Sequence, residues 1–275
     1  MRFWLLIFFL LVGNIFGWWQ APRIVRSETA LYFLDIGQGD SQLIQLDDIQ
    51  ILIDGGPDAS VLKNLEKIMA PTDRYIDLVI LSHPQLDHFG GLIDILERYE
   101  IGKFVHNGRE GTTKAYRELA EKLNEKNSLI LKEGDSIKYK DYVIKILSPS
   151  SENLKSKELN DTTIVTLLEG PDWEVLYTGD IGFNIEDQIR KKYNIQSDVL
   201  KVGHHGSRFS SGEKFLKEVK AKIAIIEVGK NSYGHPNPAA LQRLEKAGAQ
   251  VYTTLRDGII KIIPQNNQLK IFKEK

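Results

Sequence analysis

The amino-acid sequence predicts an α/β protein in which β-sheets are covered by helices. Three short apolar runs, "ALYFLDI", "SQLIQL" and "IQILIDGG", come first, with turn residues between them. Farther along, apolar strand-like runs alternate with amphipathic segments of helical spacing. No repeat of fixed period and no low-complexity tract interrupts this order. Leading strands followed by strands and helices in alternation indicate one α/β sandwich domain over residues 30–275.

The later elements follow one another in a regular order. "YIDLVILS" (75–82) is a largely apolar run typical of a buried strand, and helical spacing follows it over 90–100. "KAYRELAEKLNEK" (114–126) interleaves charges with apolar residues, as an amphipathic surface helix does. The remaining expected elements are strands at 142–148, 162–170 and 173–180, a helix near 185–193, a strand at 198–203, a helix at 212–220, a strand at 222–229, a helix at 239–248, and strands at 250–254, 258–263 and 269–273.

The N-terminal segment differs in character from the rest of the chain. "MRFWLLIFFLLVGNIFGWW" is close to the length of about 20 apolar residues that spans a bilayer. Trp18 and Trp19 stand where an interfacial aromatic belt would place them. Such a bulky pair also makes a poor cleavage site for a signal peptide. Residues 1–20 are therefore expected to be a membrane anchor, with a cleaved signal as the alternative, and residues 21–29 a linker. The domain would lie outside the cytoplasm, anchored or secreted.

Composition restricts the chemistry that the chain can perform. The 275 residues include no cysteine, which excludes disulfides and thiolate metal ligands. Any metal must be held by histidine, by carboxylates, or by amide and backbone oxygens.

The formal net charge of −1 hides an uneven distribution of charge. The stretch from Ile189 to Lys275 contains 17 Lys and Arg residues against 7 Asp and Glu residues. The excess is either an uneven surface without function or a basic surface that attracts an anionic substrate such as nucleic acid.

Histidines and aspartates gather where strands are expected to end. Five of the six histidines lie in loops that contain Gly or Pro: His83, His88, His204, His205 and His235. Loops at strand ends are where α/β folds place their sites. A single histidine is usually structural, but five of them together with Asp87 and Asp180 indicate a metal site. A set of imidazole and carboxylate donors without sulfur suits Zn or Mn.

Six motifs carry a resemblance to a known family. "FLDIGQGDSQLI", "ILIDGG", "SHPQLDHFGG", "LYTGDI", "LKVGHHGS" and "YGHPNP" resemble the C-terminal hydrolase domain of the ComEC competence proteins, within the metallo-β-lactamase superfamily. The likeness runs from about Leu31 to the end of the chain, and "GHHGS" with "GHP" downstream makes it specific. It implies a four-layer αββα sandwich, a divalent metal centre and a hydrolase connected with DNA uptake.

The resemblance also implies roles for individual residues. The expected metal ligands are His83, Gln85, Asp87, His88, Asp180 and His204. Four further residues are expected beside them as supporting partners or weak ligands: Asp54, Asn160, Asp161 and His205. The choice of His204 over the adjacent His205 rests on motif order alone.

Gln85 departs from the pattern of the superfamily, which has His there, or usually Asp in ComEC relatives. An amide oxygen can bind a metal but brings no charge. We therefore expect one firm site, built from the residues Asp87, His88, Asp180 and His204. A weaker site would contain His83, Gln85 and Asp180, with Asn160 or Asp161.

The implied chemistry is hydrolysis by a metal-activated water. Asp87 would orient or deprotonate the water, and His235 would contact a phosphate or protonate a leaving group. Alternatively His235 is a loop histidine held by its flanking prolines. The predicted function is a membrane-anchored phosphodiesterase or nuclease acting on DNA. The alternatives are hydrolysis of a small ester, thioester or lactone, and a non-catalytic DNA-binding module with a decayed metal site, because fold does not decide substrate.

Overall fold

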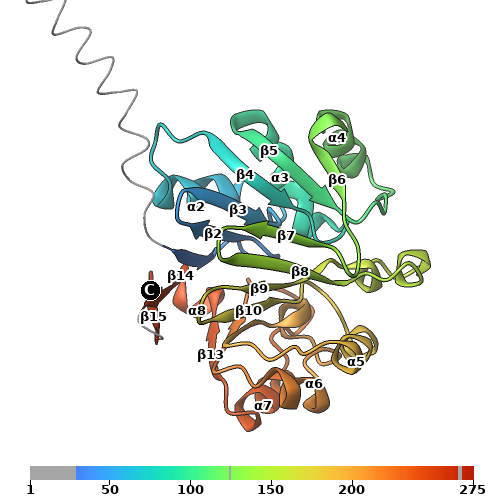
Figure 1. The fold of residues 1–275 in the computed structure, drawn as a ribbon, viewed down its shortest axis with the longest axis vertical. Helices are drawn as coiled ribbons and strands as arrows, with labels where there is room; N and C mark the ends of the chain where they lie inside the picture. The colour runs from blue at the N-terminus through green and yellow to red at the C-terminus, as the bar shows by residue number, and fades with distance from the viewer. Residues whose placement is uncertain (1–28, 124, 266–267) are drawn as a thin grey trace, which may run out of the picture.

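Two β-sheets lie face to face, and helices cover their outer faces (Figure 1). The computed structural model describes residues 29–275 except 124, 266 and 267. The predicted α/β architecture of sheets and covering helices is confirmed. The predicted anchor, and the predicted linker apart from Thr29, lie outside the described residues. Within the described part of the chain, no helix is long and apolar enough to span a bilayer.

The first sheet has eight strands in the order β15-β14-β1-β2-β3-β4-β5-β6. Strands β3, β4, β5 and β6 run parallel to one another, and the remaining neighbours are antiparallel. The strands are β1 (Ala30–Phe33), β2 (Gln42–Leu46), β3 (Ile49–Ile53), β4 (Tyr75–Ile80), β5 (Glu100–His106), β6 (Ser128–Ile130), β14 (Ile260–Gln265) and β15 (Gln268–Lys273).

The second sheet has seven strands in the order β13-β12-β11-β10-β9-β8-β7. Strands β10 to β13 form a parallel half, and β7 to β10 an antiparallel half. The strands are β7 (Ser136–Tyr139), β8 (Tyr142–Ser148), β9 (Val165–Glu169), β10 (Glu174–Tyr177), β11 (Val199–Lys201), β12 (Ile223–Ile226) and β13 (Gln250–Thr253).

The helices divide between the two outer faces. Helices α2 (Ser60–Ile68), α3 (Leu86–Arg98) and α4 (Lys114–Lys122) pack on the first sheet, and α5 (Phe183–Lys192), α6 (Glu213–Val219) and α7 (Pro238–Lys246) pack on the second. Short elements complete the chain: α8 (Thr254–Asp257) and the 3₁₀ turns η2 (Glu125–Asn127), η3 (Asn153–Lys155), η4 (Leu159–Thr162) and η5 (Gly203–Gly206).

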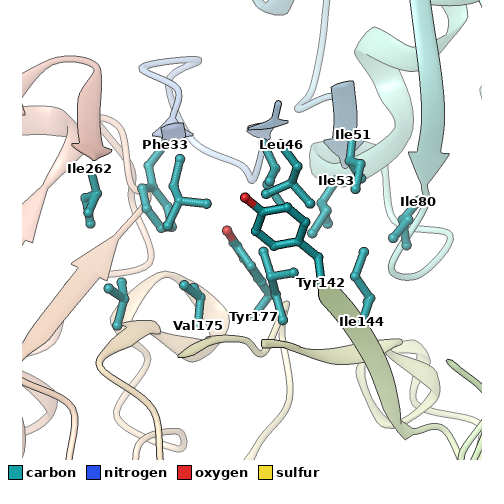
Figure 2. Close-up of a cluster of buried hydrophobic side chains, with 14 of the residues drawn as sticks. Phe33, Leu46, Ile51, Ile53, Ile80, Tyr142, Ile144, Val175, Tyr177 and Ile262 are labelled. Atoms are coloured by element: carbon teal, nitrogen blue, oxygen red, sulfur yellow. The ribbon is translucent and has the colours of Figure 1, made fainter. Parts of the chain in front are cut away.

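The alternation of side chains along a strand lets the first sheet contribute to two apolar layers, one between the sheets and one beneath the helices. In β1, Leu31 and Phe33 face the other sheet, whereas Ala30 and Tyr32 face the helices, because successive side chains point to opposite faces. Figure 2 shows the inter-sheet layer, in which Phe33 and Ile53 of the first sheet lie across from Tyr177 of the second. Each fully buried side chain of this kind contributes about 1.5–3 kcal/mol.

Some elements differ from the sequence prediction. Strands β5, β6 and β7 and helix α2 were not expected. Strand β5, "EIGKFVH", contains charges and a glycine, so its pattern is irregular. Helix α2 has its apolar residues Val61, Leu62, Leu65 and Ile68 at regular helical spacing, and this pattern was overlooked. Helix α3 begins at Leu86 rather than near residue 90, and the strand expected from residue 162 begins at Val165, because Thr162 ends a 3₁₀ turn. The earlier start of α3 brings Asp87 and His88 into its first turn.

Candidate metal centre

The functional side chains follow strands whose carboxyl ends meet at one edge of each sheet. Asp54 follows β3 and His83 follows the parallel strand β4. Asp180 follows β10, and His205 follows the parallel strand β11. Parallel strands bring the loops at their carboxyl ends to the same edge, which is where α/β folds build sites.

Four of these side chains come together in one cluster. Asp87, His88, Asp180 and His205 each offer a donor atom, and these atoms all lie within 4.8 Å of one another. Asp180 Oδ2 is 3.4 Å from His88 Nε2 and 3.5 Å from His205 Nε2. His205 Nε2 is 3.3 Å from Asp87 Oδ2. Asp180 therefore lies between the two imidazoles, with Asp87 closing the group.

The cluster fits a divalent cation. His88 Nε2, His205 Nε2 and both carboxylate oxygens of Asp180 are buried, and they make no hydrogen bond among the described residues. Buried polar atoms are normally paired, because leaving them unpaired costs several kcal/mol. Two imidazole nitrogens and two carboxylates converging on one point are a donor set that Zn or Mn accepts.

Supporting hydrogen bonds orient both imidazoles. The Nδ1 atom of His88 lies 2.8 Å from Asp54 Oδ2, and Asp54 in turn accepts from the backbone N–H and the hydroxyl of Ser82. The Nδ1 atom of His205 lies 2.9 Å from the carbonyl oxygen of Glu227. A proton held on Nδ1 by such a partner leaves the Nε2 lone pair available to a metal. Asp54 therefore lies directly behind His88, on the side of the ring away from Asp180 Oδ2.

Neighbouring charges shift the pKa values of the residues in the cluster. Burial lowers the pKa of His88, but the carboxylates of Asp180 and Asp54 outweigh it and hold that pKa well above the usual range. Burial lowers and Asp180 then raises the pKa of His205, to about 10. Burial raises the pKa of Asp180, but the adjacent imidazoles bring it well below its usual range.

His205, rather than the expected His204, enters the cluster. His204 Nε2 is 3.8 Å from Asp180 Oδ2, its side chain is 35% exposed, and its Nδ1 faces the Asn160 amide at 3.4 Å. Both histidines have left-handed backbone conformations, with φ of 49° and 51°. Two consecutive residues in this sparsely populated region turn their side chains apart, so one points into the site and the other toward its mouth. Motif order cannot distinguish them.

The residues expected at a weaker site are partly brought together. His83 is fully buried, its Nε2 makes no hydrogen bond among the described residues, and its ring centroid lies 4.1 Å from that of His88. Burial, and then His88, lower the pKa of His83 to about 3. Gln85 donates through Nε2 to Asn160 Oδ1 at 2.7 Å. Asp161 instead accepts from Ser156 Oγ at 2.8 Å, away from this group.

His235 lies beside the cluster rather than in it. Its ring centroid is 5.4 Å from that of His204 and 6.4 Å from that of His205. Its backbone N–H donates to Asn231 Oδ1, which fixes the loop, and its Nδ1 is buried without a hydrogen bond among the described residues. This position suits a contact to substrate better than a contact to a metal.

Three buried charged residues at the site escaped sequence reasoning: Asp40, Lys201 and Glu227, each at most 1% exposed. Asp40 forms an ion pair with Lys201 and lies 3.2 Å from His205 Nδ1. Lys201 also donates to the carbonyl of Gly179, next to Asp180. Glu227 accepts from the side chain of Gln42 and the backbone N–H of Ser41, and burial and then Asp40 raise its pKa. The sequence did contain a signal for two of them, because Lys201 in "VLKV" and Glu227 in "AIIEV" are charged residues within apolar runs.

Comparison with known proteins places these features in a family. Residues 34–229 match the family model described as the metallo-beta-lactamase superfamily. The chain is 31% identical to ComE operon protein 3 of Bacillus subtilis over 263 residues, which are 86% of this chain and 33% of that protein. It is 28% identical to competence protein ComA of Neisseria gonorrhoeae, over 88% of this chain and 33% of that protein. It therefore spans about a third of the length of these relatives.

A solved structure shows the same fold. The metallo-beta-lactamase fold protein YhfI of Bacillus subtilis superposes with a TM-score of 0.58 at 14% sequence identity, covering 85% of this chain and all of that one. The resemblance drawn from the six motifs is thus confirmed by an independent family model and by the fold. The chain belongs to the metallo-β-lactamase superfamily, with competence proteins among its relatives.

Proposed function

We propose that this protein is a membrane-anchored, metal-dependent phosphodiesterase that acts on DNA outside the cytoplasm. The observation that carries the hydrolase proposal is the convergence of buried, unpaired donor atoms from His88, Asp180 and His205 beside Asp87. DNA as substrate is supported by the competence proteins among the relatives and by the basic charge of residues 189–275. The anchor is proposed from the apolar sequence of residues 1–20.

The chain's own residues supply binding, orientation and proton transfer. A divalent cation, Zn or Mn, held by Asp87, His88, Asp180 and His205 would act as a Lewis acid and make water nucleophilic at neutral pH. The side chain of Asp87 is 33% exposed, and although burial raises its pKa, the neighbouring imidazoles of His205 and His88 together bring that pKa to about 2. Its carboxylate is therefore ionised and can accept a proton from an attacking water. His235, at the mouth, is placed to hydrogen-bond a phosphate oxygen or to protonate a leaving group.

A panel of substrates tests this proposal. Purified protein loaded with Zn or Mn should hydrolyse single-stranded DNA, duplex DNA or a bis-aryl phosphodiester. His88→Ala and Asp180→Ala should each lower that rate by at least about 1000-fold, because each removes a donor from the centre. Hydrolysis at the wild-type rate in either variant, with metal retained, would contradict the assignment.

The same panel separates the alternative functions. A thioester or lactone turned over in preference to every phosphodiester would indicate the small-substrate hydrolase. Purified protein that binds DNA but takes up neither Zn nor Mn would indicate a non-catalytic binding module.

A further inference from the structure

Two loops beside the metal centre contain no carboxylate. They are residues 203–211, "GHHGSRFSS", and residues 229–237, "GKNSYGHPN", and we call them the rim loops. Arg208 and Lys230 are their only fully charged side chains, in a chain with 37 Asp and Glu residues. The loops touch: the backbone N–H of Asn237 donates to the carbonyl of Gly206 at 2.8 Å. Together they form one surface that favours anions.

Large aromatic side chains are exposed on the same loops. Tyr233 is 74% exposed and Phe209 is 59% exposed. Two more exposed apolar residues begin the helices that follow site residues: Leu86 at the start of α3, next to Asp87, and Phe183 at the start of α5, shortly after Asp180. Exposed apolar side chains that gather around a polar centre indicate a binding surface.

The rings form a continuous series from the surface to the metal centre. The Tyr233 centroid is 6.0 Å from that of His235, His235 is 5.4 Å from His204, and His204 is 6.1 Å from His205. Tyr233 is the outermost ring, and His205 belongs to the cluster. On the other rim loop, the guanidinium carbon of Arg208 lies 4.6 Å from the centroid of Phe209. Each rim loop therefore offers a flat apolar face close to a cationic or imidazole group.

We propose that the rim loops bind unpaired bases of single-stranded nucleic acid on either side of a phosphate at the metal centre. Tyr233 and Phe209 stack on bases, while Arg208 and Lys230 contact the backbone. Stacking on aromatic faces along a basic path is how single strands are bound without sequence preference. In a duplex the base faces are covered by their neighbours, so the same rings would find no partner. This inference rests on the proposed function, because it places nucleic acid at the same centre.

A membrane surface is the other partner that exposed aromatic and basic side chains could meet. The Tyr233 ring lies next to His235 at the metal centre, however, and lipid that covered this ring would close the approach to His235. The geometry therefore favours the strand, and vesicle binding becomes an outcome of the test.

The test measures binding separately from catalysis. Full-length, metal-loaded protein in detergent is titrated by fluorescence anisotropy into a short thymidine strand with phosphorothioate linkages, which resist hydrolysis. A strand of the same length and linkage without bases serves as the second probe. The wild type should prefer the strand with bases. Tyr233→Ala and Phe209→Ala should each weaken its binding at least about fivefold while changing abasic binding little.

Matched variants make the result specific. Tyr233→Phe and Phe209→Tyr should restore binding, because each keeps a ring. Phe272→Ala removes an aromatic side chain that is 50% exposed on the edge strand β15, and it should bind as the wild type does. Arg208→Ala and Lys230→Ala should weaken both strands and lower the slope of log affinity against log salt by about 0.7 each.

Three outcomes would overturn the inference: equal wild-type affinity for the two strands, wild-type affinity in both ring-to-alanine variants, or duplex bound more tightly than the single strand. Loss of binding to anionic vesicles in Tyr233→Ala, with strand binding unchanged, would assign the rim to a membrane surface and overturn it as well. A protein that shows the ring-dependent preference but hydrolyses nothing would contradict the proposed function and leave the inference standing.

Discussion

At the scale of single residues, the site depends on which way a few side chains point. Consecutive left-handed conformations at His204 and His205 send one imidazole into the cluster and the other to the mouth. The ion pair of Asp40 and Lys201 lies behind His205, where buried partners make the position of that ring costly to change. The adjacent histidines therefore have different roles: His205 is a donor of the cluster, and His204 faces the mouth of the site.

The two histidines should differ in their effect on metal binding. His205→Ala removes a donor of the cluster and should weaken Zn binding by more than the 10- to 100-fold typical of losing a supporting partner. His204→Ala should weaken it by less than about tenfold. Competition titration with a chromogenic chelator measures both. Equal losses in the two variants would show that both imidazoles bind metal.

Gln85 tests the weaker site. It lies near His83 and donates to Asn160, so it is placed to provide an uncharged oxygen there. Gln85→Asp adds a negative charge beside the cation and should tighten the weaker of two sites, because hard divalent metals prefer charged oxygen donors. Titration calorimetry with Mn should show two unequal affinities that move closer in the variant. Two equally tight sites in the wild type, unchanged by the substitution, would remove Gln85 from the metal shell.

Glu186 should make stability depend on pH. Its carboxylate is buried under the 207–212 loop, accepts from the N–H groups of Ser211 and Gly212, and burial raises its pKa from 4.5 to about 7. The folded state therefore holds the proton more tightly than the unfolded state. The stability from this group is present below about pH 4.5 and is lost as pH rises to about 7, a change of about 3 kcal/mol.

Urea unfolding across that range measures the effect. Glu186→Gln carries no charge at any pH, so its free energy of unfolding should fall about 3 kcal/mol less than that of the wild type. Glu245→Gln, on the exposed side of α7, should keep the wild-type slope. Parallel curves for the wild type and Glu186→Gln would contradict the role of this carboxyl.

At the scale of elements, close backbone contacts hold the start of α3 in the site. The backbone N–H groups of Gly55 and Asp40 donate to the carbonyls of His88 and Asp87. A Cβ atom at Gly90 would lie 2.0 Å from the carbonyl oxygen of Pro57, so only glycine allows this approach. The glycine pair after His88 thus allows the start of α3 to pack directly against the backbone near Pro57.

Gly90→Ala should therefore damage stability and metal binding together. The clash is with backbone, which cannot move aside easily, so α3 must shift and carry Asp87 and His88 with it. We expect a loss of about 2–4 kcal/mol in unfolding free energy and at least tenfold weaker Zn binding. Arg98→Ala, exposed near the end of the same helix, should change neither. Thermal unfolding and metal titration of both variants check this, and a fully stable Gly90→Ala would show that the contact is loose.

At the scale of the whole molecule, two sheets share one apolar layer, and their loops meet at one edge. The first sheet supplies Asp54, His83 and the start of α3, and the second supplies Asp180 and the histidines after β11. The centre is therefore complete only when both sheets are packed. Because the inter-sheet layer includes Phe33, Ile80, Tyr177 and other large buried side chains, metal binding and packing should stabilise each other.

The proposed anchor is tested on the complete chain. If residues 1–20 span a membrane, the protein should stay in the membrane fraction after high-salt and carbonate washes, and a fragment that begins near Ser27 should be soluble. The apolar run supplies the burial that resists extraction. A mature, freely soluble form that lacks about the first twenty residues would show a cleaved signal instead.

Much of the fold follows from local sequence pattern. Apolar runs bounded by turn residues predicted most of the strands, and helical spacing predicted α3 to α7, because both patterns reflect burial on one face. The motifs around His83, Asp87, His88 and Asp180 likewise named residues that the fold brings together, since each stands directly after a strand. These features depend on neighbours in sequence, and sequence alone contains them.

Only the tertiary structure decided the rest of the site. Whether His204 or His205 turns inward depends on backbone dihedral angles that adjacent identical residues do not reveal. Asp40, Lys201 and Glu227 meet across up to 187 positions of chain, and their pairing exists only because two sheets pack together. Strand β5 joins its sheet because it is covered by neighbours despite an irregular pattern. Side-chain direction and long-range pairing are properties of the packed chain, which is why local pattern could not give them.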